Sequence, residues 1–224
     1  MIDILAHRAN LTGPNVTTEN SLSACTESLA SGFGLEIDLR RTFDGFLISH
    51  DPVQWSAATD IRAFAELFAK YPAAPIAVNV KELGYEAELI GLALEGAFGQ
   101  AAFYFDFELL EPRMPGAAQR KLRALPGGKG VRLAARLSDR AEPMEQCLDI
   151  PADVVWADEF DQLWLTRNHV ETVHRAGRKF FAISPELHGF SKAERQNRWA
   201  DFRKWEIDGL CTDFPVEARN FFSG

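Results

Sequence analysis

The feature that most constrains this fold is a regular alternation of short apolar runs with longer amphipathic stretches. The runs expected to form strands are 2–6, 34–39, 46–49, 76–80, 101–107, 131–135, 153–157, 179–183 and 210–212. The stretches expected to form helices are 19–31, 60–71, 85–98, a segment from about 117, 142–147, 166–176, 193–205 and 216–222. The β-then-α unit recurs about eight times, which predicts parallel βαβ units. We therefore expect an α/β fold, a (β/α)₈ TIM barrel in which the extra strand 46–49 forms a small insertion after the second strand.

An open, doubly wound sheet is the competing architecture. It would usually carry a glycine-rich turn after the first strand, whereas residues 7–10 read His-Arg-Ala-Asn. A single barrel also suits the length of 224 residues. We expect one domain that spans residues 1–224.

Composition narrows the class of partner. The formal net charge of -8 argues against a nucleic-acid-binding face, which would be basic. The widely spaced cysteines Cys25, Cys147 and Cys211 predict reduced, buried thiols rather than a disulfide framework. The sequence has no basic-then-apolar leader and no apolar stretch of about 18 residues. We expect a cytoplasmic protein without a transmembrane segment, and the oligomeric state stays open.

Polar residues gather where the predicted strands end. In a barrel these carboxyl-terminal ends form the face that carries the active site. In chain order the residues are His7 and Arg8, Glu36 and Asp38, His50 and Asp51, then Asn79 and Lys81.

Glu36 and Asp38 are two residues apart on a predicted strand, so their side chains point to the same face. Two neighbouring carboxylates repel each other unless a positive charge neutralises them. A divalent cation does so, and oxygen ligands suit Mg²⁺ or Ca²⁺. The alternative is a structural pair that interacts with Arg40 and Arg41.

His7 and His50 each follow a predicted strand. Either histidine alone would be compatible with a structural role. Together, on both sides of a carboxylate pair, they suit general acid-base catalysis beside a metal ion. Arg8 and Lys81 add positive charges that could bind a phosphate group.

An ordered series of short motifs resembles one family. It comprises Ala6-His7-Arg8, Thr18-Glu19-Asn20-Ser21, Leu35-Glu36-Ile37-Asp38-Leu39-Arg40, Asp44-Gly45, His50-Asp51 and, near the end, Thr212-Asp213-Phe214-Pro215. This series resembles the glycerophosphodiester phosphodiesterase family. The resemblance is strong over residues 5–51, moderate over 76–82 and 209–215, and faint between these segments.

The resemblance implies a barrel with an insertion after the second strand, and a role for each motif residue. His7 and His50 would be the acid-base pair, with Asp51 orienting His50. The cation would be held by Glu36, Asp38 and the residue at position 79, and the phosphate by Arg8 and Lys81. The implied reaction is hydrolysis of a small glycerophosphodiester-type substrate to a phosphomonoester, such as glycerol 3-phosphate, and an alcohol, with Mg²⁺ or Ca²⁺.

The chain departs from the family pattern at several positions. Ala9 replaces a usual glycine, and Asn79 replaces the usual third carboxylate ligand. An amide oxygen can still bind a hard cation, but it adds no charge. Asp106 is a candidate replacement ligand, and His188 a candidate substrate contact.

Two other functions remain open. Related barrels cleave phospholipid head groups by intramolecular transfer, which leaves a cyclic phosphate. A barrel could also keep the shape of the site and bind phosphorylated ligands without turning them over, and Asn79 keeps this alternative open.

Overall fold

The computed structural model describes residues 2–223 and confirms the predicted barrel. Its eight parallel strands follow the order β5-β4-β2-β1-β9-β8-β7-β6. Tyr104 N donates a hydrogen bond to Arg132 O at 3.1 Å, which brings the two ends of this order together. The strands are β1 Asp3–Ala6, β2 Gly34–Thr42, β4 Ile76–Val80, β5 Phe103–Phe105, β6 Ala134–Leu137, β7 Val154–Ala157, β8 Lys179–Ile183 and β9 Gly209–Thr212.

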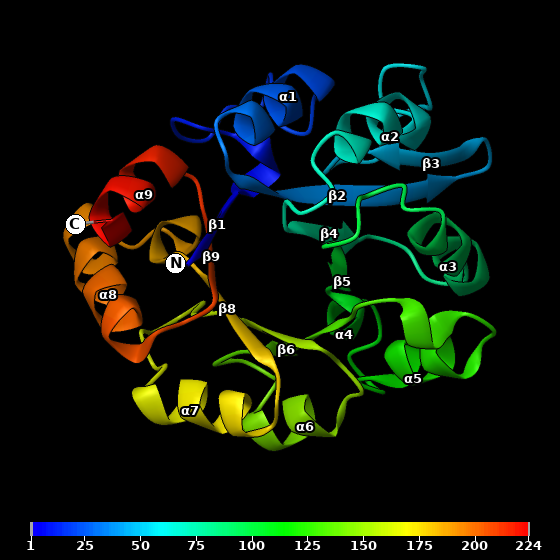
Figure 1. Ribbon diagram of the computed structural model, residues 1–224. Helices are drawn as coiled ribbons and strands as arrows, with labels where there is room; N and C mark the ends of the chain where they lie inside the picture. Colours follow the sequence, from blue (N-terminus) through cyan, green and yellow to red (C-terminus); the bar gives the residue numbers. More distant parts are fainter. Residues whose placement is uncertain (1, 224) are drawn as a thin grey trace.

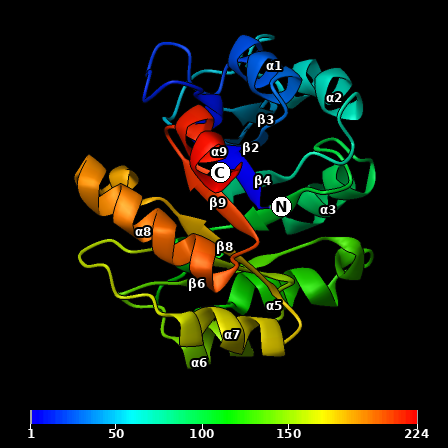
Figure 2. The same cartoon turned by 60° about the vertical axis from the view of Figure 1, so that its left-hand side comes forward.

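Helices surround this ring of strands (Figure 1). They are α1 Leu22–Ala30, α2 Ile61–Ala69, α3 Glu86–Leu94, α4 Phe107–Leu110, α5 Ala117–Ala124, α6 Met144–Asp149, α7 Arg167–Arg175, α8 Lys192–Trp205 and α9 Pro215–Ser223. Three 3₁₀ turns, η1 His7–Ala9, η2 Gly128–Gly130 and η3 Pro185–His188, complete the described elements. The last helix, α9, packs beside β1 and β9, so the two ends of the chain meet in one part of the barrel (Figures 1 and 2).

The insertion lies between β2 and α2. Strand β3 (Gly45–Ile48) turns back on β2 and pairs with it in antiparallel register, from Leu39–Ile48 to Thr42–Gly45. Gly45 has a φ of 146°, a conformation that glycine adopts without a steric penalty. Residues 49–60 then form a loop that leads to α2.

Aromatic side chains fill the inside of the barrel. Phe103 and Phe105 alternate along β5, so both point inward and pack against Trp156 of β7. The ring centroids of Phe105 and Trp156 are 4.3 Å apart. This packed layer closes the barrel beneath the polar ends of the strands, and a cavity at those ends therefore has an aromatic floor.

Two local features differ from the expected elements. Strand β6 begins at Ala134 rather than at residue 131, because η2 and the single bridge at Leu133 precede it. Helix α4 was not expected, since four residues are too few to show a helical period. It follows Asp106, which has a left-handed φ of 71°.

Two further expectations concern the cysteines and the absence of a transmembrane segment. Cys25, Cys147 and Cys211 are buried and free, as predicted. Within residues 2–223 we find no helix with both the length and the apolar character of a transmembrane segment.

Candidate active site

A cavity of about 210 Å³ opens at the carboxyl-terminal ends of the strands. The seven residues that the sequence singled out as site candidates all contribute to its lining: His7, Arg8, Glu36, Asp38, His50, Asn79 and Lys81. Residues from the opposite side of the barrel complete the lining, among them Asp106, Arg136, Asp158, Phe160 and His188. The fold therefore brings together side chains from almost every strand end.

His7 follows β1 directly and is held by Asp213, which follows β9. The β1–β9 register pairs Ala6 with Thr212, so the next residues of the two strands are neighbours. The His7 Nδ1 and Asp213 Oδ1 atoms are 2.7 Å apart, and His7 Nε2 lies 3.9 Å from Glu36 Oε2. Burial opposes protonation of His7, but the hydrogen bond to Asp213 and the charge of Glu36 outweigh it, so the pKa of His7 is raised.

Glu36 and Asp38 point into the cavity from β2 and are 3% and 1% exposed. Burial, together with the charge of Asp38, raises the pKa of Glu36 to about 7. Burial acts in the same direction on Asp38, but Lys81 Nζ and Asn20 Nδ2, each at 2.8 Å, outweigh it and lower the pKa of Asp38. The two carboxyl groups therefore differ in how readily they ionise, although they share one strand face.

Asn79 lies beside Asp38 in the β2–β4 register. Its Oδ1 atom is buried and accepts no hydrogen bond from the described residues. Such an orphaned acceptor needs an explanation, and an ion is one. Over residues 2–223 no cluster of three or more His, Cys, Asp or Glu side chains is placed to hold a metal. Glu36, Asp38 and Asn79 nevertheless offer three oxygen donors of the kind that Mg²⁺ and Ca²⁺ prefer, so these residues fit a divalent cation.

Arg8 and Lys81 place positive charge at the edge of the carboxylate pair. Arg8 Nη1 lies 3.1 Å from Glu19 Oε1, and its backbone N donates to Glu36 Oε2 at 3.0 Å. The turn that presents Arg8 is left-handed at two successive residues, with φ of 49° at Arg8 and 64° at Ala9. Ala9, at the position where the resemblance implies a glycine, thus adopts a left-handed conformation that favours glycine.

His50 reaches the same cavity from the insertion. Its Nδ1 atom lies 2.8 Å from Asp51 Oδ1, and its backbone carbonyl accepts a hydrogen bond from Arg40 Nε at 2.9 Å. The side chain is 37% exposed, in contrast to the more enclosed His7. The two histidines therefore line one cavity, each with a carboxylate partner on Nδ1.

The opposite side of the cavity is built around Arg136 of β6. Its guanidinium group is 4% exposed and forms ion pairs with Asp106 and Asp158. Asp158 also bonds Nε2 of His188. Asp106, considered above as a replacement metal ligand, pairs with Arg136 through its Oδ1 atom.

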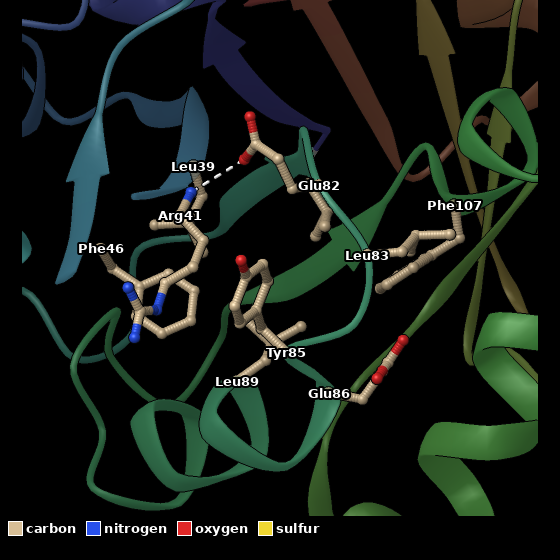
Figure 3. A pocket seen from close by; sticks show the side chains of 10 residues that line it. Leu39, Arg41, Phe46, Glu82, Leu83, Tyr85, Glu86, Leu89 and Phe107 are labelled. Atoms are coloured by element: carbon tan, nitrogen blue, oxygen red, sulfur yellow. Dashed lines mark hydrogen bonds between the residues drawn. The ribbon is translucent and has the colours of Figure 1, made fainter. Parts of the chain in front are cut away.

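A second, smaller pocket lies outside the barrel between the β2–β3 hairpin and α3 (Figure 3). Its volume is about 10 Å³, which is about the space that one water molecule needs. Arg41 N donates to Glu82 Oε2 at 2.8 Å, and the Arg41 guanidinium lies over the rings of Phe46 and Tyr85. This pocket is a packing feature rather than a second site.

No protein-family model matches the chain, and no curated protein sequence matches it at a significant level. Solved structures do resemble it over its whole length. A Galdieria sulphuraria protein assigned as a glycerophosphodiester phosphodiesterase has a TM-score of 0.70 and 17% identity, covering 100% of this chain and 98% of that one. A glycerophosphoryl diester phosphodiesterase from Parabacteroides distasonis has a TM-score of 0.68 and 15% identity, covering 100% and 86%.

A 2,3-dimethylmalate lyase shares the fold at a TM-score of 0.55 and 15% identity, with 99% of this chain and 77% of that chain covered. At such identities these likenesses show the fold alone. They confirm the (β/α)₈ barrel, and the sequence resemblance agrees with the architecture of the two diesterase structures. Because one barrel hosts unrelated reactions, the function must be argued from the site.

Proposed function

We propose that this protein is a phosphodiesterase that hydrolyses a glycerophosphodiester-type substrate to a phosphomonoester and an alcohol. One observation carries the proposal: His7 and His50 line the cavity that also contains the Glu36–Asp38 pair. Two histidines beside an acidic cluster and cationic side chains suit acid-base catalysis at phosphorus. The fold shared with two diesterase structures adds support.

The two histidines divide the proton transfers in this proposal. When Nδ1 of His7 donates to Asp213, Nε2 is left with a lone pair, and the same logic applies to His50 and Asp51. One imidazole takes a proton from the attacking water as its oxygen bonds to phosphorus, and the other protonates the leaving alcohol oxygen as its bond to phosphorus breaks. Arg8 and Lys81 bind the phosphate oxygens and fix the orientation of the diester.

Glu36, Asp38 and Asn79 would hold a divalent cation, Mg²⁺ or Ca²⁺. When bound, the cation supplies positive charge to the phosphoryl oxygens. The residues themselves show why the site suits it. Burial and the charge of Asp38 raise the pKa of Glu36, and the Asn79 amide oxygen has no hydrogen-bond donor among residues 2–223. Lys81 Nζ and Arg8 Nε both pair with Asp38, at 2.8 and 3.6 Å, whereas Glu36 has only the imidazole of His7, at 3.9 Å, among the described ion pairs.

The test is turnover of a glycerophosphodiester by the wild type, His7→Ala and His50→Ala with added Mg²⁺ or Ca²⁺. We expect each variant to lose at least about a hundredfold in kcat/KM, the usual contribution of a general acid or base. His174→Ala is the matched control, because His174 pairs with Asp208 at the amino end of β9, at the other end of the barrel. Full activity in both site variants would refute the assignment.

Phosphorus NMR of the product distinguishes hydrolysis from intramolecular transfer. A phosphomonoester supports the proposal, whereas a stable cyclic phosphate would identify a lyase. Diester binding without product in the presence of any divalent metal would identify a non-catalytic binding barrel instead.

A further inference from the structure

On the side opposite His7, the cavity is lined by an arginine, two aspartates and a histidine. We call Asp106, Arg136, Asp158 and His188 the Arg136 cluster. Arg136 is buried and uses both terminal nitrogens on carboxylates, Nη1 on Asp106 and Nη2 on Asp158. Because its charge is already compensated by these partners, Arg136 is not available to bind the phosphate of a substrate.

The Arg136 cluster contains unpartnered polar atoms on three side chains, and the buried Nε of Arg136 is one of them. Asp106 uses Oδ1 for Arg136, and His188 uses Nε2 for Asp158. Asp106 Oδ2 and His188 Nδ1 have no partner among residues 2–223, and both side chains line the cavity. The first accepts a hydrogen bond and the second donates or accepts one, according to its tautomer. A hydroxyl group, which can do both, matches these atoms.

Aromatic rings complete this part of the cavity. Phe105 and Trp156 form its floor, and the ring of Phe160 lies 4.4 Å from the ring of His188. Phe160 is already in contact with cations, because the guanidinium carbons of Arg136 and Arg140 lie 4.9 and 4.3 Å from its centroid. Both guanidinium groups are themselves paired with carboxylates, Arg136 with Asp106 and Asp158 and Arg140 with Asp161.

We propose that the Arg136 cluster binds a neutral, polyhydroxylated alcohol arm of the diester, such as a sugar or cyclitol, in preference to an arm without hydroxyl groups. The inference rests on the proposed function, since it places the phosphate near His7 and His50. The hydroxyl groups bond Asp106 Oδ2 and His188 Nδ1, and the apolar ring face packs on Phe105 and Trp156. His188 and Asp106 are then residues that determine specificity.

The test compares kcat/KM for glycerophosphoinositol, glycerophosphocholine and bis(p-nitrophenyl) phosphate. The wild type should prefer the inositol ester to the choline ester by at least about tenfold, the factor that one hydrogen bond provides. In His188→Gln the value for the inositol ester should fall about tenfold more than that for bis(p-nitrophenyl) phosphate, which has no polyol arm. His174→Gln, at the other end of the barrel, should leave all three values unchanged.

Each outcome decides for or against the inference. A preference for the choline ester, or an equal loss for all substrates in His188→Gln, overturns it. Asp106→Asn should reproduce the selective loss, and His188→Gln carries the test if that variant does not fold. If the wild type hydrolyses no diester, the proposed function fails, and binding of inositol 1-phosphate by calorimetry decides the inference. Weaker binding in His188→Gln than in the wild type supports it, and equal binding overturns it.

Discussion

The hydrogen bond between His7 and Asp213 joins the first and last strands of the barrel at the candidate active site. We expect Asp213→Asn to lower the pKa of His7, because the pKa is raised by Asp213 and Glu36 against the effect of burial. NMR titration of the imidazole resonances measures this change directly. The limb of the pH–activity profile that reflects ionisation of His7 should shift to lower pH by a similar amount. An unchanged His7 titration would show that Asp213 does not control this imidazole.

At Asn79 the proposed cation site departs most from the pattern that the sequence resemblance implies. Asn79→Asp adds a third negative charge beside Asp38, so we expect it to tighten Ca²⁺ or Mg²⁺ binding by about tenfold or more. Calorimetry, or a metal-induced rise in Tm, measures this without any turnover. Asn168→Asp, an exposed change on α7, is the control and should have no effect. Equal metal affinity in the wild type and Asn79→Asp would remove Asn79 from the site.

At this scale the sequence predicted which residues gather but not how they pair. Candidates at strand ends could be found because the carboxyl ends of parallel strands meet at one face. The partner of His7 could not, since 206 positions separate His7 from Asp213 and only the β1–β9 register makes them neighbours. The pairing of Asp106 with Arg136 could not be foreseen for the same reason, because the two residues belong to different strand ends.

At the scale of the elements, the strands and most helices could be predicted from the periodicity of apolar residues and from the residues that begin or end a helix. The short α4 and the 3₁₀ turns could not, because they depend on backbone conformations such as the left-handed Asp106. Asp60 marks the beginning of α2 as its N-cap residue. Its Oδ1 accepts from Arg62 N at 2.8 Å at the start of α2, and its Oδ2 accepts from Trp55 Nε1 at 2.9 Å.

We expect Asp60→Ala to lower the free energy of unfolding by about 1–2 kcal/mol, since it removes the N-cap of α2. The loss also includes the bond that holds the inserted loop through Trp55. Urea unfolding measures the difference. Glu66→Ala, an exposed acidic position on the same helix, should change stability by no more than about 0.5 kcal/mol. Equal effects of the two substitutions would mean that the cap contributes nothing.

At the scale of the whole molecule, closure of the sheet unites residues from both ends of the chain in one cavity. Since β1 lies between β2 and β9, His7 is placed between the carboxylate pair of β2 and Asp213. In this cavity the carboxyl groups of Glu36 and Asp38 are buried side by side, and like charges held together for function cost stability. That residues 1–224 form one domain stays a prediction, which coincident unfolding transitions by circular dichroism and tryptophan fluorescence would support.

This cost in stability should appear as a pH dependence of the free energy of unfolding of the metal-free protein. The pKa of Glu36 is about 7 in the folded protein, against 4.5 for an ordinary glutamate. The folded state therefore binds the proton more tightly, and stability falls as pH rises from about 4.5 to about 7. In EDTA at pH 8, Glu36→Gln should be more stable than the wild type by on the order of 3 kcal/mol. The difference should vanish near pH 4, where Glu36 is neutral in both states, and shrink when Ca²⁺ or Mg²⁺ replaces EDTA. Urea unfolding at the two pH values measures it, and an equal difference at both would show that the charge of Glu36 does not destabilise the barrel.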